Sequence, residues 1–111
     1  MKHQMNLAPK PFKSIAEGRK TVEMRLYDEK RSALSVGDEI EFKNIETNAT
    51  IRCVVLELTR YKTFDDLYAH FDKLAIGYGE NDTADPKDML AYYSPEQIEK
   101  YGALAIVIKL I

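Results

Sequence analysis

Polar and apolar residues alternate from Lys20 to Tyr27, directly after Gly18. Successive side chains of a β-strand point to opposite faces, so this alternation predicts a strand with one face in the core. The other face would carry polar side chains able to line a site, namely Thr21, Glu23, Arg25 and Tyr27. Any half-buried strand shows the same alternation, so the pattern alone leaves open whether this face forms a site or is simply solvated.

The residues before this strand predict a short strand and a brief helix. Met5 and Leu7 alternate with polar residues, which is typical of a half-buried strand. Pro9 and Pro11 suit the first turn of a helix, where a missing backbone N–H costs nothing. Gly18 fits the left-handed residue that ends many helices. We therefore expect the helix to lie between Pro9 and Gly18.

The middle of the chain predicts a hairpin. Gly37-Asp38 is a turn signal before the strand Glu39–Phe42, and Asn44–Asn48 has the composition of a hairpin turn. The run Thr50–Thr59 is the longest predicted strand. Because it is apolar on both faces around its middle, we expect it at the centre of a barrel rather than at an edge.

The last part of the chain predicts short helices and a closing strand. A cap at Thr63 precedes an apolar stripe with helical spacing, formed by Phe64, Leu67, Tyr68 and Phe71. A flexible polar loop is expected at 77–83. After it, Asp85-Pro86 and Ser94-Pro95 each predict a helix start. The alternative to a cap at Ser94 is a hydroxyl that faces the cleft. The run Ala103–Ile111 is rich in β-branched residues. About five strands with short helices predict an α+β fold, a small mixed β-barrel, in a single domain spanning residues 1–111.

The composition is that of an ordinary globular chain, with 45% hydrophobic and 31% charged residues. No apolar run approaches the roughly 20 residues that span a bilayer, and the first residues show no secretory signal, so we expect a cytoplasmic protein without a membrane span. The single cysteine, Cys53, lies in an apolar run and is predicted to be buried. Since only His3 and His70 accompany it, no metal-ligand spacing is present, and we expect neither a metal site nor a cofactor.

Charge is distributed unevenly along the chain. The net charge of −2 argues against binding of long polyanions by bulk electrostatics. Residues 10–31 contain seven basic and four acidic side chains, whereas residues 64–99 contain nine acidic and two basic ones. A locally basic site on an otherwise acidic protein fits a nucleotide-sized or short single-stranded ligand better than a duplex. Scattered surface charge without a function is the alternative interpretation.

Lys20, Glu23 and Arg25 are the candidate functional residues. In a binding site, Lys20 and Arg25 would contact phosphate or base acceptor atoms, and Glu23 would accept from an exocyclic amine. Tyr27 or Tyr78 would stack on the base. In a hydrolase, the same three charged residues would supply a base, an oxyanion stabiliser and a positioned nucleophile. Burial beside Arg25 would favour a neutral Lys20 amine, whereas a nearby Glu23 would favour fixed charges.

These residues also carry a resemblance to a known family. Gly18, Lys20, Glu23 and Arg25 match a Gly-x-Lys-x-x-Glu-x-Arg signature, with Pro11-Phe12 upstream and the Gly-Asp strand entry of Val36–Phe42 downstream. Together they resemble an ASCH domain of the PUA-like superfamily, over most of the chain. The resemblance implies a PUA-like β-barrel of five to six strands, with helices around a cleft that the signature residues line.

The resemblance further implies RNA or a modified nucleoside as the ligand. Relatives include RNA-binding modules, proposed ribonucleases and small amidohydrolases that remove the acetyl group from N4-acetylcytidine. In the amidohydrolases the lysine matching Lys20 is the central catalytic group, helped by a threonine and a later glutamate. Here Glu23 stands in the threonine position, and Glu80 is the leading match for the later glutamate.

The sequence and the resemblance together give two sets of candidate site residues, one catalytic and one for ligand binding. The catalytic candidates are Lys20, Glu23 and Glu80, and the ligand-binding candidates are Lys20, Thr21, Glu23, Arg25, Tyr27 and Tyr78. Binding of RNA or a nucleoside is the leading hypothesis, and hydrolysis of that ligand is the alternative. A third hypothesis, from a different class, is a protein-interaction module whose acidic second half docks a basic partner.

Overall fold

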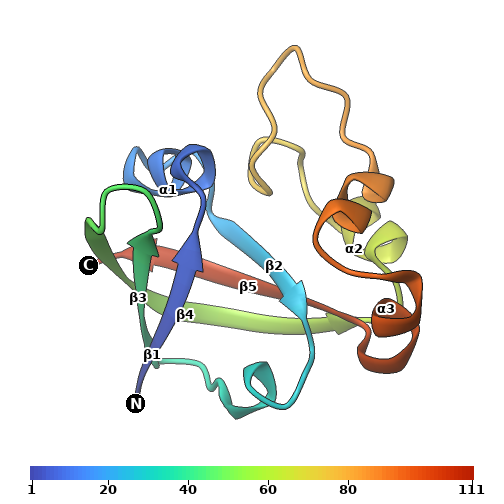
Figure 1. Ribbon diagram of the computed structural model, residues 1–111, viewed down its shortest axis with the longest axis horizontal. Coiled ribbons are helices and arrows are strands. Elements are labelled where there is room, and N and C mark those ends of the chain that lie inside the picture. Colours follow the sequence, from blue (N-terminus) through green and yellow to red (C-terminus); the bar gives the residue numbers. More distant parts are fainter.

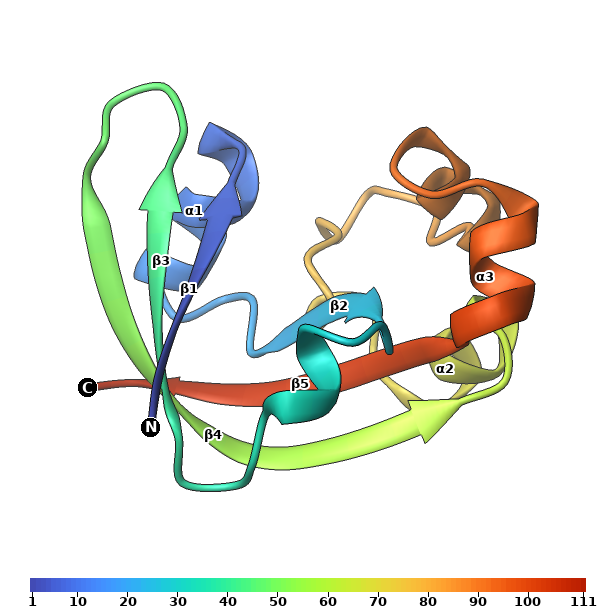
Figure 2. The ribbon, with the colours of Figure 1, turned by 60° about the horizontal axis from the view of Figure 1, so that its bottom comes forward.

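The framework of the protein is a curved five-stranded sheet, seen in the computed structural model of residues 1–111 (Figure 1). The strands are β1 (Lys2–Leu7), β2 (Val22–Leu26), β3 (Glu39–Asn44), β4 (Thr50–Tyr61) and β5 (Ala103–Leu110). Their spatial order is β1-β3-β4-β5-β2, with β1 and β3 parallel and the other pairs antiparallel. The long strands β4 and β5 bend with the sheet, which forms an open half-barrel with β1 and β2 at its edges (Figure 2). The predicted α+β class and mixed barrel are confirmed, with β4 at the centre.

Short helices lie at two places around this sheet. The first is α1 (Pro9–Ala16), which connects the edge strands β1 and β2. The second is a group formed by α2 (Phe64–His70), the 3-10 helix η2 (Pro86–Ala91) and α3 (Pro95–Tyr101), which we call the helical lobe (residues 64–101). Figure 1 shows α1 and the helical lobe on opposite sides of β2.

The helix ends follow the local signals in the sequence. The Thr63 hydroxyl accepts from the Asp66 N–H at the start of α2, and Ser94 and Gln97 form a reciprocal capping box at the start of α3. The start predicted at Asp85 is also present, but it opens the 3-10 helix η2 instead of an α-helix. A further 3-10 turn, η1 (Arg31–Ala33), lies between β2 and β3.

Two hydrophobic clusters share β5 between them. Alternate residues of β5 pack inward on the half-barrel cluster, around Ile15, Ile40 and Phe42, or on a second cluster that joins the sheet to the helical lobe, around Phe64 and Leu67. Cys53 is fully buried in the first cluster, as predicted, and burial raises the pKa of its thiol to about 11. Each face of β5 is covered by one of the two clusters. Strand β2 pairs with β5 in the sheet and therefore also lies between the two clusters.

Candidate functional site

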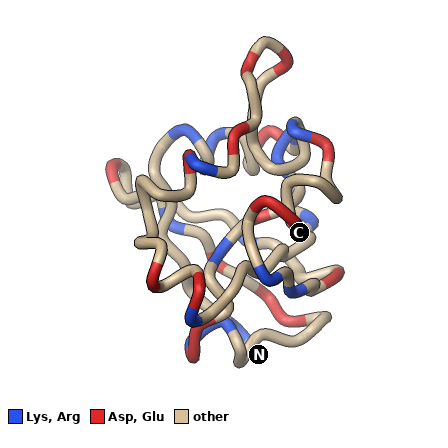
Figure 3. Tube along the Cα trace, turned by 90° about the vertical axis from the view of Figure 1, so that its right-hand side faces the viewer, with Lys and Arg blue, Asp and Glu red and all other residues tan.

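A cleft with a volume of about 990 Å³ separates the half-barrel from the helical lobe. One wall comes from the end of β1, from α1 and from β2, and the other wall comes from the helical lobe. The loop between α2 and η2 borders the second wall and projects from the molecule, with acidic but no basic residues at its tip (Figure 3). Of the residues that line the cleft, Lys10, Lys20, Glu23 and Arg25 lie on the first wall, and Asp82, Lys87 and Asp88 lie on the second.

The C-terminal end of α1 directs Lys20 into this cleft. Gly18 adopts a left-handed φ of 77°, and the backbone N–H groups of Arg19 and Lys20 both donate to the carbonyl of Ser14 at 3.0 Å. The next N–H groups, of Thr21 and Val22, both donate to the Ala75 carbonyl at 3.0 Å. The chain is thus fixed on both sides of Lys20, whose side chain is only 8% exposed.

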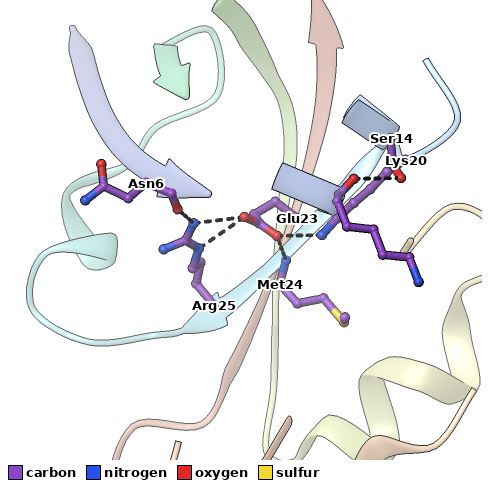
Figure 4. Close-up of polar contacts among 7 residues, drawn as sticks. Asn6, Ser14, Lys20, Glu23, Met24 and Arg25 are labelled. Carbon is purple, nitrogen blue, oxygen red and sulfur yellow. Dashed lines mark hydrogen bonds and ion pairs between the residues drawn. The ribbon is translucent and has the colours of Figure 1, made fainter. Parts of the chain in front are cut away.

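The side chain of Glu23 joins Lys20 and Arg25 into one ion cluster (Figure 4). Its Oε1 accepts from Lys20 Nζ at 2.9 Å, and its Oε2 accepts from Nε and Nη2 of Arg25 at 3.2 and 3.0 Å. Oε1 also accepts from the Met24 N–H at 3.0 Å. The carboxylate is therefore held by two cations and one backbone group.

Burial and the two cations shift the pKa of Glu23 in opposite directions. The residue is only 4% exposed. Loss of water around the carboxylate by itself would raise the pKa of Glu23. The charges of Lys20 and Arg25, together with their hydrogen bonds, outweigh that effect and leave the pKa of Glu23 below its usual value of 4.5. Glu23 is thus an ionised, buried carboxylate at neutral pH.

Strand register explains why Glu23 is buried and Arg25 is partly buried although both lie on the polar face of β2. Glu23 pairs with Ile106 and Arg25 pairs with Leu104 on β5, and these β5 residues belong to the half-barrel cluster. Paired residues of adjacent strands share a face, so the polar face of β2 looks into the half-barrel. The opposite face, with Val22 and Leu26, is buried in the cluster that joins the sheet to the helical lobe, and the predicted core face of this strand is confirmed.

The structure brings together only some of the predicted site residues. Lys20, Glu23, Arg25 and Tyr78 all line the cleft. Three others do not line it: Thr21 is exposed just before β2, Tyr27 lies beneath the Arg60 guanidinium at 3.8 Å from its ring centroid, and Glu80 is exposed on the projecting loop. The geometry therefore supports a smaller site than the sequence indicated.

Tyr78 takes part in a hydrogen-bonded chain on the helical-lobe wall. Its hydroxyl lies 2.8 Å from the Tyr68 hydroxyl and donates to Asp88 Oδ2 at 2.7 Å. Burial, Tyr68 and Asp88 together raise the pKa of Tyr78 well above its usual range. Burial likewise raises the pKa of Tyr68. Both phenols keep their protons at physiological pH.

Several residues of the cleft were not among the sequence candidates. They include Asn6, Ser14, Tyr68, Asp88 and Tyr93. The sequence places Tyr68 in the apolar stripe of its helix, and it does pack there, but a half-buried tyrosine hydroxyl usually needs a polar partner. That requirement was the available signal that this helix face continues into a polar wall. Ser94 lies outside this cleft and caps α3, as the first of its two interpretations predicted.

No cluster of three or more His, Cys, Asp or Glu side chains in the structure is arranged to hold a metal ion. None of the helices combines the length and apolar character that crossing a membrane requires.

Comparison with known proteins gives one family and several similar structures. The model of the ASCH domain matches residues 5–111. A crystal structure of the hypothetical protein PH0355 has 28% sequence identity and a TM-score of 0.84, with 100% of both chains covered. A solution NMR structure of protein PF0455 from Pyrococcus furiosus has 26% identity and a TM-score of 0.78, with coverage of 100% of this chain and 98% of that one.

A third similar structure shares only the fold. It is the crystal structure of an S128A mutant of the ZmASCH protein from Zymomonas mobilis, with 17% identity and a TM-score of 0.68. The alignment covers 96% of this chain and 66% of that one. A comparison with curated protein sequences gave no match.

Proposed function

The chain belongs to the ASCH domain family, and on this premise we propose that its cleft is a recognition site for RNA or a nucleoside. The family is associated with RNA binding. The observation that carries the proposal is the ion cluster, in which one buried carboxylate holds Lys20 and Arg25 in fixed positions at the cleft wall. Cations that are held in place before binding suit the recognition of phosphate and of base acceptor atoms.

The size and lining of the cleft support a ligand of this class. A volume of about 990 Å³ is at the upper end of the roughly 300–1,000 Å³ that small-molecule sites occupy. Tyr92 and Tyr93 line the cleft, and Tyr92 is 71% exposed. A base stacked on an aromatic ring gains roughly 1–3 kcal/mol, so an accessible tyrosine would contribute substantially to nucleoside affinity.

Hydrolysis of the bound ligand is a second candidate, favoured by the place of Lys20. Its side chain is buried at the cleft wall, in the position where the resemblance puts the catalytic lysine of the N4-acetylcytidine amidohydrolases. The ion cluster weighs against hydrolysis with Glu23 as the general base. A general base needs a lone pair directed at the proton that it removes. Lys20 Nζ and Met24 N already donate to one Glu23 oxygen, and Arg25 donates twice to the other.

The test is incubation of the purified protein with short single-stranded RNA and, separately, with N4-acetylcytidine. Affinity is measured by titration at two salt concentrations, since contacts to phosphate weaken as salt rises. Product is followed by chromatography. For the wild-type chain we expect binding without turnover, and for Lys20→Ala we expect weaker binding. Lys20→Met, which keeps the length of the side chain, separates loss of charge from loss of packing.

Lys13→Ala is the matched control, because Lys13 is an exposed lysine of α1 that does not line the cleft. Its affinity should stay at the wild-type value. Turnover that disappears in Lys20→Ala would make the protein a hydrolase. Absence of both binding and turnover would contradict the proposal for these ligands. A protein-interaction module would instead retain a basic protein partner in the presence of excess RNA.

A further inference from the structure

Glu23 has no acceptor position left for a ligand. Its Oε1 accepts from Lys20 Nζ and Met24 N, and its Oε2 accepts from both Nε and Nη2 of Arg25. An ionised carboxylate offers about four lone-pair positions, and here four donors use them. The role that the sequence suggested for Glu23, accepting from the exocyclic amine of a base, must therefore belong to another part of the cleft if the cleft recognises such an amine.

The hydrogen-bonded chain on the helical-lobe wall has a fixed direction. A phenol has one proton, and an ionised carboxylate only accepts. The Tyr78 hydroxyl lies 2.7 Å from Asp88 Oδ2 and 3.2 Å from the Asp85 carbonyl, and neither oxygen can donate to it, so the contact of 2.8 Å between the two phenols takes the proton of Tyr68. Both phenolic protons are then committed within the chain. The groups of this chain that are left to accept from a ligand are the Tyr68 hydroxyl oxygen and the second carboxylate oxygen of Asp88, and both residues line the cleft.

Tyr68 and Asp88 therefore face the cleft with acceptors, opposite a wall of donors. The wall formed by α1 and β2 contributes Lys10, Lys20 and Arg25, and the helical-lobe wall contributes Tyr68 and Asp88, with Lys87 as a further donor beside Asp88. The walls meet at Gly77, where an added Cβ would lie 3.7 Å from Lys20 Nζ. Since Tyr78 follows Gly77 directly, the acceptor chain begins beside Lys20, so a ligand of nucleoside size could contact both walls.

We propose that the helical-lobe wall selects nucleobases that carry an exocyclic amine, with the amine donating to Asp88 and to the Tyr68 hydroxyl oxygen. This inference rests on the proposed function, because it names the ligand class of the same cleft. Cytosine and adenine present an amine at the position where uracil and hypoxanthine present a carbonyl. A carbonyl placed against Tyr68 and Asp88 would face acceptors, and neither it nor those oxygens would have a hydrogen-bond partner. Tyr68 and Asp88 are thus specificity-determining residues.

The test compares two pairs of ligands that differ in this group, cytidine with uridine 5′-monophosphate and adenosine with inosine 5′-monophosphate. Affinities are measured by calorimetric titration of the full-length chain. We expect the amine-bearing member of each pair to bind about 5- to 100-fold more tightly, the range expected for one well-formed base contact. In Asp88→Asn the preference should shrink or invert, because an amide can donate to a carbonyl. Tyr68→Phe should reduce the preference without inverting it.

Asp65→Asn is the matched control, since it makes the same change of charge at an exposed position of α2 that does not line this cleft. It should retain the wild-type preference. Asp88 is exposed, so Asp88→Asn should fold, which circular dichroism checks. Equal affinities within both pairs would overturn this inference, and so would an undiminished preference in Asp88→Asn. Neither result would contradict the proposed recognition site. If none of the four nucleotides binds but short single-stranded RNA does, this inference fails and the proposed function stands. If RNA does not bind either, both fail.

Discussion

The Arg25 guanidinium on β2 donates to the backbone carbonyl of Asn6 on β1, at 2.9 Å, and so connects the two edges of the sheet. No strand pairing joins β1 to β2, so this side-chain contact bridges the open seam of the half-barrel. The same guanidinium also donates twice to Glu23. The proposed recognition site and the closure of the sheet therefore depend on one residue, which couples ligand binding to the stability of the fold.

Arg25→Ala should destabilise the protein by roughly 2–4 kcal/mol, since it removes charged hydrogen bonds from a buried carboxylate. Arg25→Lys keeps the charge but not the planar fork, and we expect an intermediate loss. The free energy of unfolding in urea measures both. The control is Arg60→Ala, which removes a guanidinium stacked on Tyr27 outside the cleft and should cost less than about 1 kcal/mol. Similar losses at positions 25 and 60 would show that the seam contact contributes little.

The lowered pKa of Glu23 predicts a specific dependence of stability on pH. Because the folded-state value lies below the usual value of 4.5, the ionised carboxylate contributes stability that is fully present above about pH 4.5. This contribution is lost as the pH falls through the lowered folded-state value. Glu23→Gln should therefore be less stable than wild type by about 3 kcal/mol at pH 7, and the difference should narrow in strongly acidic solution. Urea unfolding of both proteins from pH 7 to pH 2 tests this, and a difference that stays constant over the whole range would contradict it.

Signals that act over a few residues were sufficient to predict most elements. Proline in the first turn, a hydroxyl cap and a left-handed glycine each act on backbone groups within one helical turn. For this reason α1 begins and ends, and α3 begins, where the sequence indicated. The alternation in β2 likewise reflects a two-residue period that any strand must obey. Such features depend on neighbours in sequence and are visible without a structure.

The contacts of the site were less predictable because they depend on tertiary structure. Lys20 and Glu23 have opposite nominal strand parity, yet they meet, because Lys20 precedes β2 and its backbone is held by the Ser14 carbonyl. Tyr27 has the same parity as Glu23 and Arg25, but it lies beyond the end of β2 and packs under Arg60. The acceptor chain from Tyr68 to Asp88 joins two helices that are separated by the projecting loop, and no sequence period reports such a contact.

The two interpretations of Ser94, a helix cap and a hydroxyl that faces the cleft, predict different effects when the residue is substituted. Its hydroxyl accepts from the Gln97 N–H at 3.2 Å at the start of α3, and it does not line the cleft. Ser94→Ala should lower the free energy of unfolding by about 1 kcal/mol, the usual cost of losing an N-cap, and should leave RNA affinity unchanged. Ser94→Asp, which can also cap, should retain most of the stability. A loss of affinity in Ser94→Ala without a loss of stability would favour a hydroxyl that acts on the ligand.

Gly77 and Gly37 form a matched pair that tests whether the helical lobe positions Lys20. Both have positive φ angles, 111° and 93°, so alanine at either position should cost roughly 1–3 kcal/mol in backbone strain. At Gly37 an added Cβ meets no atom within 4 Å, whereas at Gly77 it would lie 3.1 Å from Cδ of Lys20 and force that side chain to move. We therefore expect both variants to lose stability in urea unfolding, but only Gly77→Ala to lose affinity for short single-stranded RNA. If Gly77→Ala binds RNA as tightly as Gly37→Ala does, the ligand does not depend on the position of Lys20 that this contact sets.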